Sequence, residues 1–350
     1  MAKKAELILI SLLRILDQKR IDYYKENESM KFLRSVVNAV GLFVLASGLA
    51  VAQQNDIATQ LKLIIGANAN NYLEPLASGL GAGLNSGFYH SADLHSVLGF
   101  DIGIKIGLAS IADEHKTFDF VLPATLGPYS VAAGDYDKSV HNAPTFAGPT
   151  TGVPVKVKTG RPGAGTVIFT TPRGYDYSRL PLFAPQASIG LPFGLEVIGR
   201  FLPSTNIGDA GKVNFIGFGL RHDIDQYIPF CPVDIAVHFM TQKVTVNDKN
   251  GNKVMSLSGT AFGAEVSKSL LIMTLYGGFQ IESSKLTVDS YTPDPILGQP
   301  TSVGGFSIDG ANKTRALVGV RFLLAIINVH ADYSFSKYPV ATAGVGITFR

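Results

Sequence analysis

Near its C-terminal end the chain alternates between apolar and polar or small residues with a period of two. Residues 327–335 carry an apolar side chain at every second position, and residues 341–349 repeat this pattern after a turn at 337–339. A period of two is typical of β-strands that have two different faces. Each run is about ten residues long, the length that a tilted strand needs to cross the hydrocarbon core of a membrane. The pattern predicts two transmembrane strands joined by a tight turn.

The alternation is clearest over residues 98–108. One face of this segment consists of glycines together with Asp101 and Lys105, and burying these charges in the dry core of a soluble protein would be costly. A strand with lipid on one side and water on the other accommodates both faces. The apolar face is formed by Leu98, Phe100, Ile102, Ile104, Ile106 and Leu108.

Further strands are predicted along the chain, beginning with a glycine-rich strand at Gly81–His90. Val153–Lys158 and Thr166–Thr170 are compatible with a small additional hairpin. We count about twelve strands, or fourteen with this hairpin, and bacterial barrels prefer even numbers. The expected fold is therefore all-β, an antiparallel transmembrane β-barrel of about 12–14 strands with an N-terminal helical cap or plug. The remaining alternating runs are 187–201, 213–220, 233–246, 254–266, 271–281 and 316–324.

The amino-terminal region predicts a secretory signal peptide at 30–52. A short basic start at Met30–Arg34 precedes an apolar run, and Ala50-Val51-Ala52 supplies the small residues of a cleavage site. Residues 1–29 stand in front of it, and we interpret them as an upstream extension that is not translated, with translation starting at Met30. The alternative is a cytosolic extension on an uncleaved anchor.

Two segments break the strand pattern. Residues 53–79 contain apolar positions with helical spacing, notably 57–72, and predict a helix that either caps one barrel mouth or folds into the lumen as a plug. Residues 80–350 would form the barrel, with a long loop at 123–181 that is extracellular and able to fold over the pore. This loop gathers basic residues that either bind anions such as lipid phosphates or keep a solvated surface soluble, namely Lys156, Lys158, Arg161, Arg173 and Arg179.

Composition agrees with a barrel and excludes several classes. The mean hydropathy of +0.22 is modest because half of each transmembrane strand is polar. Residues 1–52 hold eight of the 30 Lys/Arg and five of the 27 Asp/Glu, so residues 53–350 hold 22 basic and 22 acidic residues. This part of the chain is therefore neutral, and nucleic acid is not an expected partner. The single Cys231 cannot form an internal disulfide. A soluble β-sandwich, or a secreted soluble β-protein, is the weaker alternative.

Local motifs resemble known families. The stretches 72–76, 80–89 and 98–101, with Gly217–Ile224 followed by Pro229, resemble an uncharacterised outer-membrane β-barrel family of Bacteroidota, a domain of unknown function. A helical plug ahead of about fourteen strands is similar in layout to the long-chain fatty-acid outer-membrane transporter group. The final strand ending at Phe349 resembles the closing strand of outer-membrane barrels, which implies recognition by the barrel-insertion machinery. These resemblances imply a place among the lipids of the bacterial outer membrane.

The sequence does not predict an enzyme. No nucleophile, phosphate-loop or metal-ligand motif occurs, and no cofactor is expected. His222, Asp223 and Asp225 are interpreted as a polar turn at the barrel rim, and His90, Asp93, His95 and Asp101 as solvent-facing turn residues.

Two functions remain open at this point. The first is a pore or transporter for small molecules, hydrophobic ones included, with an unknown solute; the second is a non-conducting structural or partner-docking barrel. The candidate lumen residues, which would equally serve as a structural polar network, are Asp101, Lys105, Glu196, Arg200, Gln280, Asn328, His330 and Asp332.

Overall fold

Ten antiparallel strands form a closed β-barrel in the computed structural model, which describes residues 67–206, 211–248, 251–289 and 305–349. Each strand pairs with its neighbours along the barrel, the last with the first, and the ring is complete because β12 pairs with β13. A short additional strand, β14 (Phe306–Asp309), pairs with the far end of β13. The ten barrel strands are β1 (Phe100–Ser110), β8 (Arg179–Leu191), β9 (Leu195–Asn206), β10 (Lys212–Asp223), β11 (Asp234–Asn247), β12 (Lys253–Leu270), β13 (Met273–Val288), β15 (Thr314–Leu324), β16 (Ile327–Phe335) and β17 (Val340–Phe349).

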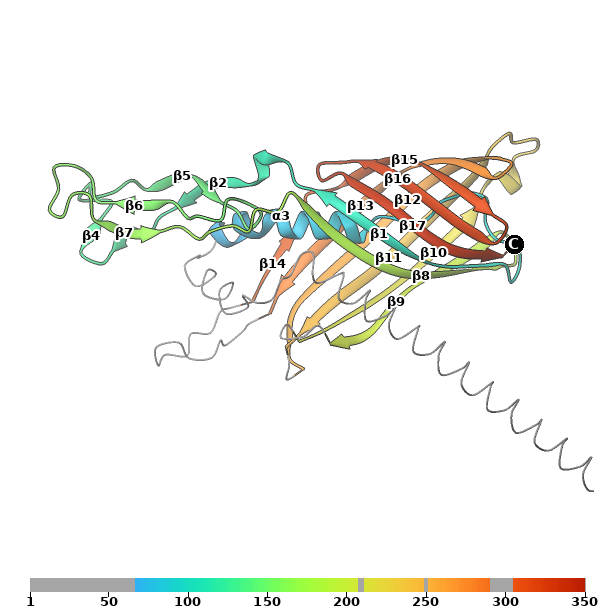
Figure 1. Ribbon diagram of the computed structural model, residues 1–350, viewed down its shortest axis with the longest axis horizontal. Coiled ribbons are helices and arrows are strands. Elements are labelled where there is room, and N and C mark those ends of the chain that lie inside the picture. The colour runs from blue at the N-terminus through green and yellow to red at the C-terminus, as the bar shows by residue number, and fades with distance from the viewer. Residues whose placement is uncertain (1–66, 207–210, 249–250, 290–304, 350) are drawn as a thin grey trace, which may run out of the picture.

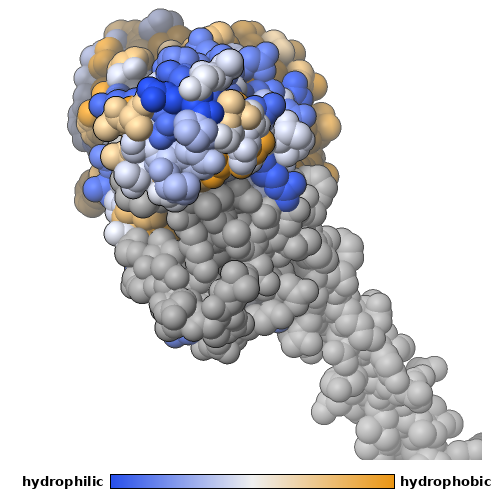
Figure 2. Space-filling view, turned by 90° about the vertical axis from the view of Figure 1, so that its left-hand side faces the viewer, coloured by the Kyte–Doolittle hydropathy of each residue, from blue (hydrophilic) through white to orange (hydrophobic). Residues whose placement is uncertain are grey.

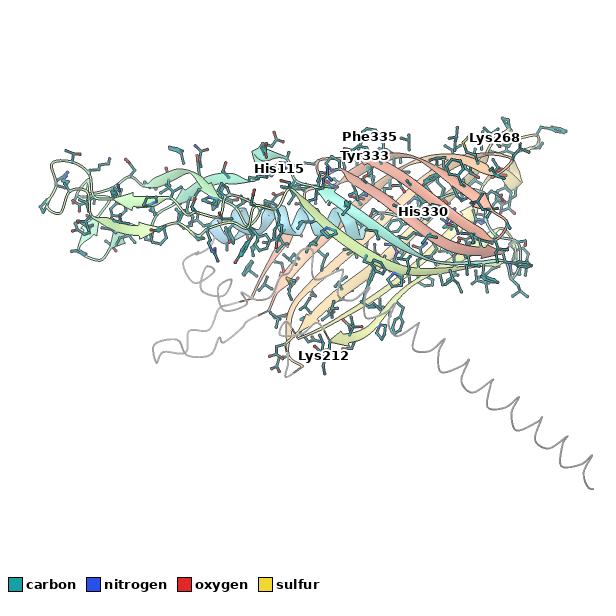
Figure 3. The ribbon with its side chains drawn as sticks, in the orientation of Figure 1. His115, Lys212, Lys268, His330, Tyr333 and Phe335 are labelled. Atoms are coloured by element: carbon teal, nitrogen blue, oxygen red, sulfur yellow. The ribbon has the colours of Figure 1, made fainter. Side chains whose placement is uncertain are left out.

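The apolar face of the strands points outward, as the alternation predicts for a barrel in lipid. Tyr333 and Ile347 are 42% and 52% exposed, whereas Asp101 and Lys105 are each only 2% exposed. Tyr333 and Phe335 lie on the outer wall, and Lys212 and Lys268 mark its two rims (Figure 3). A soluble protein would reverse this arrangement, so the interpretation as a soluble sandwich is wrong.

The number of strands in the wall is ten rather than 12–14. The predicted hairpin forms, as β6 (Pro154–Lys156) paired with β7 (Val167–Thr170), but it lies outside the barrel. The predicted strand at Gly81–His90 is wrong, because its first residues end a helix and the rest has no strand partner. The glycines have another role: Gly79, just before this segment, and Gly83, within it, let the helix approach Leu180 and Leu182 closely.

The helix of this region is α3 (Ala67–Leu84), which starts outside the barrel and ends inside it (Figure 1). Its described residues overlap the second part of the predicted helix over 57–72, and Pro75 lies within it rather than ending it. Residues 57–66, the predicted signal peptide at 30–52 and the extension at 1–29 lie outside the described residues. Among the residues that the structure describes, no helix is both long and apolar enough to span a bilayer.

The connection between β1 and β8 forms an elongated arm, defined here as residues 111–178. It projects away from the barrel (Figure 1), so the expectation that it folds over the pore is wrong. The buried ring of Phe120 packs against Phe118 and Phe169 in its interior. The described arm contains one 3-10 turn, η2 (Asp113–His115), and three short strand pairs. These pairs are β2 (Thr117–Val121) with β5 (Ser139–Pro144), β3 (Thr125–Leu126) with β4 (Tyr129–Ser130), and β6 with β7.

The start of α3 is tied to the arm by hydrogen bonds from a side chain and from the backbone. Asn68 donates to the carbonyl of Val121 at 2.7 Å and accepts from its N–H at 3.0 Å. The N–H of Phe146 donates to the carbonyl of Tyr72 at 2.8 Å. The chain therefore enters the barrel from the arm end, and α3 runs down the lumen toward the other end.

The two barrel ends differ in their connections. At the end that holds Phe100 and Phe349, the strands are joined by short turns, such as Pro192–Gly194 and Leu271–Ile272, and by the connection that contains η4 (Asp225–Tyr227). The opposite end carries the arm. Figure 2 views the molecule from that end, where hydrophilic side chains dominate the nearest surface. Short turns on one side and long connections on the other are typical of outer-membrane barrels.

Candidate functional site

The lumen of the barrel is filled by the plug, defined here as residues 78–99. It comprises the last turns of α3 and the irregular segment that leads to β1. Irregular backbone inside a barrel must find hydrogen-bond partners, because unpaired buried carbonyl and N–H groups are costly. Inward-facing side chains of the wall supply many of these partners.

Arg200 of β9 holds the plug where the helix ends. Its guanidinium donates to the carbonyls of Leu84 at 3.0 Å and Ser86 at 2.7 Å, and to the side chains of Gln186 and Gln242. Its guanidinium carbon lies 4.7 Å from the ring centre of Phe88. Only 1% of Arg200 is exposed, so its charge is balanced by oxygen dipoles and the aromatic face.

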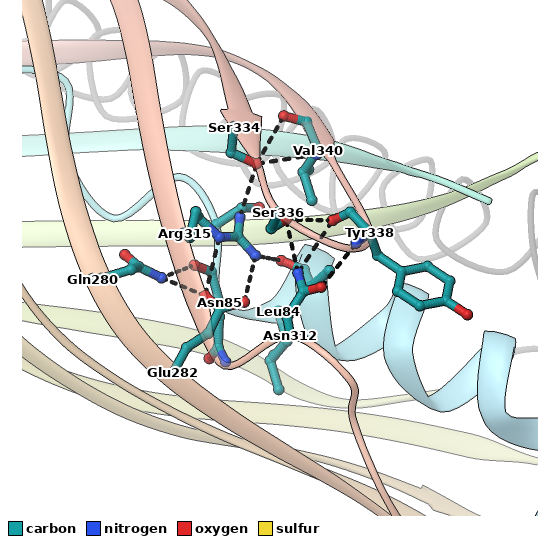
Figure 4. Close-up of polar contacts among 12 residues, drawn as sticks. Leu84, Asn85, Gln280, Glu282, Asn312, Arg315, Ser334, Ser336, Tyr338 and Val340 are labelled. Carbon is teal, nitrogen blue, oxygen red and sulfur yellow. Dashed lines mark hydrogen bonds and ion pairs between the residues drawn. The ribbon is translucent and has the colours of Figure 1, made fainter. Parts of the chain in front are cut away.

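Arg315 of β15 makes an equivalent contact one turn earlier (Figure 4). It donates to the carbonyl of Ala82 at 2.6 Å and pairs with both oxygens of Glu282 at 3.0 Å. Gln280 donates to Glu282 at 2.6 Å and to the carbonyl of Asn85 at 3.0 Å. Arg315 and Gln280, both paired with Glu282, thus hold the plug carbonyls of Ala82 and Asn85 in a buried site.

Arg221 of β10 holds the segment that follows the helix. It donates to the carbonyl of Ser91 and to Glu196 and Glu265, each carboxylate contact being 2.7 Å. Glu196 also contacts the plug directly, through the ring Nδ1 of His95 at 2.6 Å. The two carboxylates are 1% and 2% exposed, so Arg221 is the cation that compensates both.

A fourth polar group joins the plug to β1 and β16. Lys105 lies 3.0 Å from the Nε2 of His330, whose Nδ1 lies 3.1 Å from Asn328. Asn328 donates to Asp101 at 2.5 Å, and His90 of the plug lies 3.5 Å from the same carboxylate. These residues form one connected network across the lumen.

The outer part of α3 is held by a turn of the barrel. The hydroxyl of Tyr338, between β16 and β17, donates to Glu74 at 2.6 Å. Burial, followed by this hydrogen bond, raises the pKa of Tyr338 above its usual value, so the hydroxyl keeps its proton and remains the donor. α3 is therefore fixed near both of its ends.

A family model matches residues 30–349. The chain belongs to the family of unknown function DUF6588. This finding confirms the predicted resemblance to a family of unknown function, while an origin in Bacteroidota and the likeness to fatty-acid transporters stay predictions. No curated protein matches this DUF6588 member.

Several solved outer-membrane β-barrels are similar to this DUF6588 chain at low scores. Ail of Yersinia pestis is 16% identical, with 72% of this chain and 99% of that chain covered and a TM-score of 0.19. A loop-deleted OmpT of Vibrio cholerae is 14% identical, with 72% and 76% covered and a TM-score of 0.25. Neisserial surface protein A is 14% identical, with 40% and 85% covered and a TM-score of 0.21.

All eight predicted lumen residues of this DUF6588 protein are buried inside the barrel. Asp332, the most exposed, is 8% exposed and accepts from Tyr276 at 3.0 Å. His90 and His95 were predicted to face solvent, which is wrong, since both are 6% exposed within the plug. His222 and Asp225 do lie in a rim turn, where Asp225 accepts from the N–H of Ile235 at 2.6 Å. The inward-facing residues that sequence reasoning missed are Arg221, His238, Glu265, Glu282, Arg315 and Arg321.

The signal for these missed residues was present in the alternation. Arg315 and Arg321 occupy the same face of one strand as Leu317, and Glu265 alternates with Phe262, Ala264 and Val266. Once the outward face is known, the alternation of odd and even positions along each strand places these residues in the lumen.

The five predicted basic loop residues, four in the arm and Arg179 at the start of β8, do not create a basic arm. The arm contains six Lys/Arg and six Asp/Glu. Lys158 pairs with Asp137 at 2.7 Å, and Arg173 lies over the ring of Tyr175. Lys156, Arg161 and Arg179 are exposed.

The lumen shows binding geometry for the plug rather than a reaction centre. Within the described part of the chain, no group of three or more His, Cys, Asp or Glu side chains is arranged to hold a metal ion. The buried charges contact plug backbone or each other, so their arrangement serves to hold a segment in place.

Proposed function

We propose that this protein is a bacterial outer-membrane barrel that is closed to ions and holds a rigid docking arm outside the cell. The proposal is carried by one observation, the burial of Arg200, Arg221 and Arg315 on backbone carbonyls of the plug. A hydrogen bond to a charged group contributes about 1.5–3 kcal/mol. Several must break together before the plug leaves, so the closed state is strongly favoured.

The arm supports the docking half of the proposal. Its interior is packed with aromatic side chains and its base is tied to α3, so it keeps its shape without a partner. A preorganised surface loses little conformational entropy on binding. The helix α3 then has a second role, since its start holds the base of the arm while its end forms part of the plug.

A pore or transporter is the competing proposal, and it requires displacement of the plug. Electrical recording separates the two. In planar bilayers of known lipid composition, the purified full chain should give no stepwise conductance. Steady ohmic steps from the unaltered protein would contradict a closed barrel and would support an open pore for small solutes.

Orientation is tested by a large cysteine reagent on intact cells. Thr159 is exposed on the arm, while the native Cys231 lies between β10 and β11 at the opposite end. A 5-kDa polyethylene glycol maleimide should modify Thr159→Cys in a Cys231→Ser background but leave Cys231 of the unaltered protein unmodified until cells are lysed. The reverse labelling pattern would place the arm in the periplasm.

The closing strand fits the proposed insertion route. Phe349 is 59% exposed on the outer wall and stacks on Phe100 of β1, with ring centres 6.1 Å apart. We propose that the insertion machinery recognises this strand before β1 covers it.

A further inference from the structure

The wall of the barrel is incomplete between β8 and β9. These strands pair only from Gln186 opposite Arg200 to Leu191 opposite Leu195. Beyond that point residues 179–185 of β8 still pair with β1, and residues 201, 202, 205 and 206 of β9 still pair with β10. It is the shortest of the ten seams among the described strands, and Figure 1 shows the two strands diverging toward the arm end.

The sequence of the two facing edges explains why they do not pair. Pro181 and Pro185 lie on β8, and Pro203 lies on β9. Proline has no N–H to donate to a neighbouring strand and is normally confined to sheet edges. The gap is therefore encoded in the strands themselves.

The part of the gap next to the last paired residues, Gln186 and Arg200, lies at the level of the lipid-facing side chains. Phe201 pairs with Ile216 of β10, and both side chains are 63% exposed on the outer wall. On the other flank Pro185 pairs with Ile104 of β1, whose neighbour Ile102 is 57% exposed. Lipid tails, not water, are the medium at this level.

An apolar groove of about 610 Å³ lies on the lipid-facing side of the wall at this gap. Its lining includes outward-facing Phe201 and Ala187, but also Leu202 and Gln186, which face the lumen and are 4% and 6% exposed. The groove therefore reaches the point where β8 and β9 separate. Gln186 is hydrogen-bonded to Arg200 at 2.9 Å, so the last paired residues form the polar floor of the groove.

The part of the lumen behind the gap is lined by apolar side chains, unlike the neighbouring polar layer that contains Gln186 and Arg200. Leu182, Leu202 and Phe215 face inward there and are at most 9% exposed, and Leu182 lies against Gly83 of α3. An apolar chain entering from the bilayer would thus stay in apolar surroundings and stop at Gln186 and Arg200. It would also cover the unpaired strand edges.

We propose that the gap between β8 and β9 is a lateral opening that takes up the acyl chain of a membrane lipid into the apolar part of the lumen. This goes beyond the closed barrel proposed above, because the axial path for ions and the sideways path for an apolar chain are separate. Its test is also separate from the conductance recording.

The first test measures whether the strands are apart. Paired antiparallel residues have Cα atoms about 4.5–5.5 Å apart, within the range that a disulfide bridges. In a Cys231→Ser background, Ser188→Cys with Ile198→Cys, which are paired, should oxidise to a disulfide. Ala184→Cys with Leu202→Cys, the pair that a continued ladder would create, should remain reduced. Equal oxidation of both pairs would overturn the proposal.

The second test identifies the occupant. The full chain is reconstituted in phosphatidylcholine vesicles that contain a phosphatidylcholine with a diazirine in one acyl chain, and labelled residues are mapped after illumination. Lumen-facing Leu202 and Leu182 should be labelled together with outward-facing Phe201. Labelling confined to outward-facing side chains would show an ordinary lipid annulus and would overturn the opening.

A matched pair of variants controls the mapping. Ala187 lines the groove, whereas Ala264 is an outward-facing alanine on β12, away from it. Ala187→Phe should fill the groove and remove the label from Leu202 while labelling of Phe262 persists. Ala264→Phe should leave the label on Leu202 in place, and equal effects of the two substitutions would contradict a route through the gap.

Discussion

Replacing Arg221 by Met is expected to lower the free energy of unfolding by about 3–5 kcal/mol, the cost of leaving buried charges without their partner. The guanidinium is the cation that lies between Glu196 and Glu265, at 2.7 Å from each, and it also donates to the carbonyl of Ser91. Without it, two almost fully buried carboxylates repel each other and one plug carbonyl loses its donor. Unfolding by urea in lipid vesicles, followed by circular dichroism because the chain has no Trp, gives the measurement.

The prediction has two controls. Arg179→Met removes an exposed arginine at the rim and should change stability little. Adding Glu196→Gln and Glu265→Gln to Arg221→Met should restore part of the loss, because the unpaired charges are then gone. A decrease below about 1 kcal/mol for Arg221→Met would show that the carboxylates are compensated by other groups or by water.

Replacing Arg200 by Ala is expected to convert a silent barrel into one that opens intermittently. Four hydrogen bonds and the contact with Phe88 disappear, and the carbonyl of Ser86 loses its donor. Gln242 still donates to the carbonyl of Leu84 at 2.7 Å, so the plug is weakened rather than released. A net loss of about 3 kcal/mol raises the population of a displaced plug roughly 100-fold.

Single-channel recording in planar bilayers measures this effect as brief conductance steps. Amide hydrogen exchange of residues 78–99 should accelerate in parallel, while exchange in β11 and β12 stays slow. Arg200→Lys keeps the charge but not the fork of donors. Its conductance steps and its hydrogen exchange should therefore be intermediate between those of the unaltered protein and of Arg200→Ala. Silence of Arg200→Ala together with unchanged exchange would show that Arg200 does not hold the plug.

The plug shows why part of the site was out of reach of sequence reasoning. Gly81–His90 has the composition of a glycine-rich strand, and nothing local distinguishes it from one. In the fold it cannot be a strand, because α3 continues to Leu84 and the following carbonyls are satisfied by Arg200, Gln280 and Gln186 from distant strands. Such partners lie 98 to 195 residues away in the chain, and no local pattern encodes them.

The predicted number of strands in the barrel wall was wrong for a related reason. The hairpin of β6 and β7 has good strand sequences and does form, but in the arm. Local propensity determines that two segments pair, whereas inclusion in the wall depends on whether the neighbouring edges are already occupied. β1 already pairs with β8 and β17, so no edge is left for the hairpin to join.

By itself the sequence determined the two-faced strands and which residues share each face, because a period of two depends only on local backbone geometry. Which face is the outer one did not follow from the period, and the predicted signal peptide and the terminal aromatic residue favoured the apolar face. Only the tertiary structure decided that the lumen is plugged, that three arginines hold the plug, and that β8 and β9 separate. These features arise from contacts between segments far apart in the chain, where the burial of each charge depends on groups that no short stretch contains.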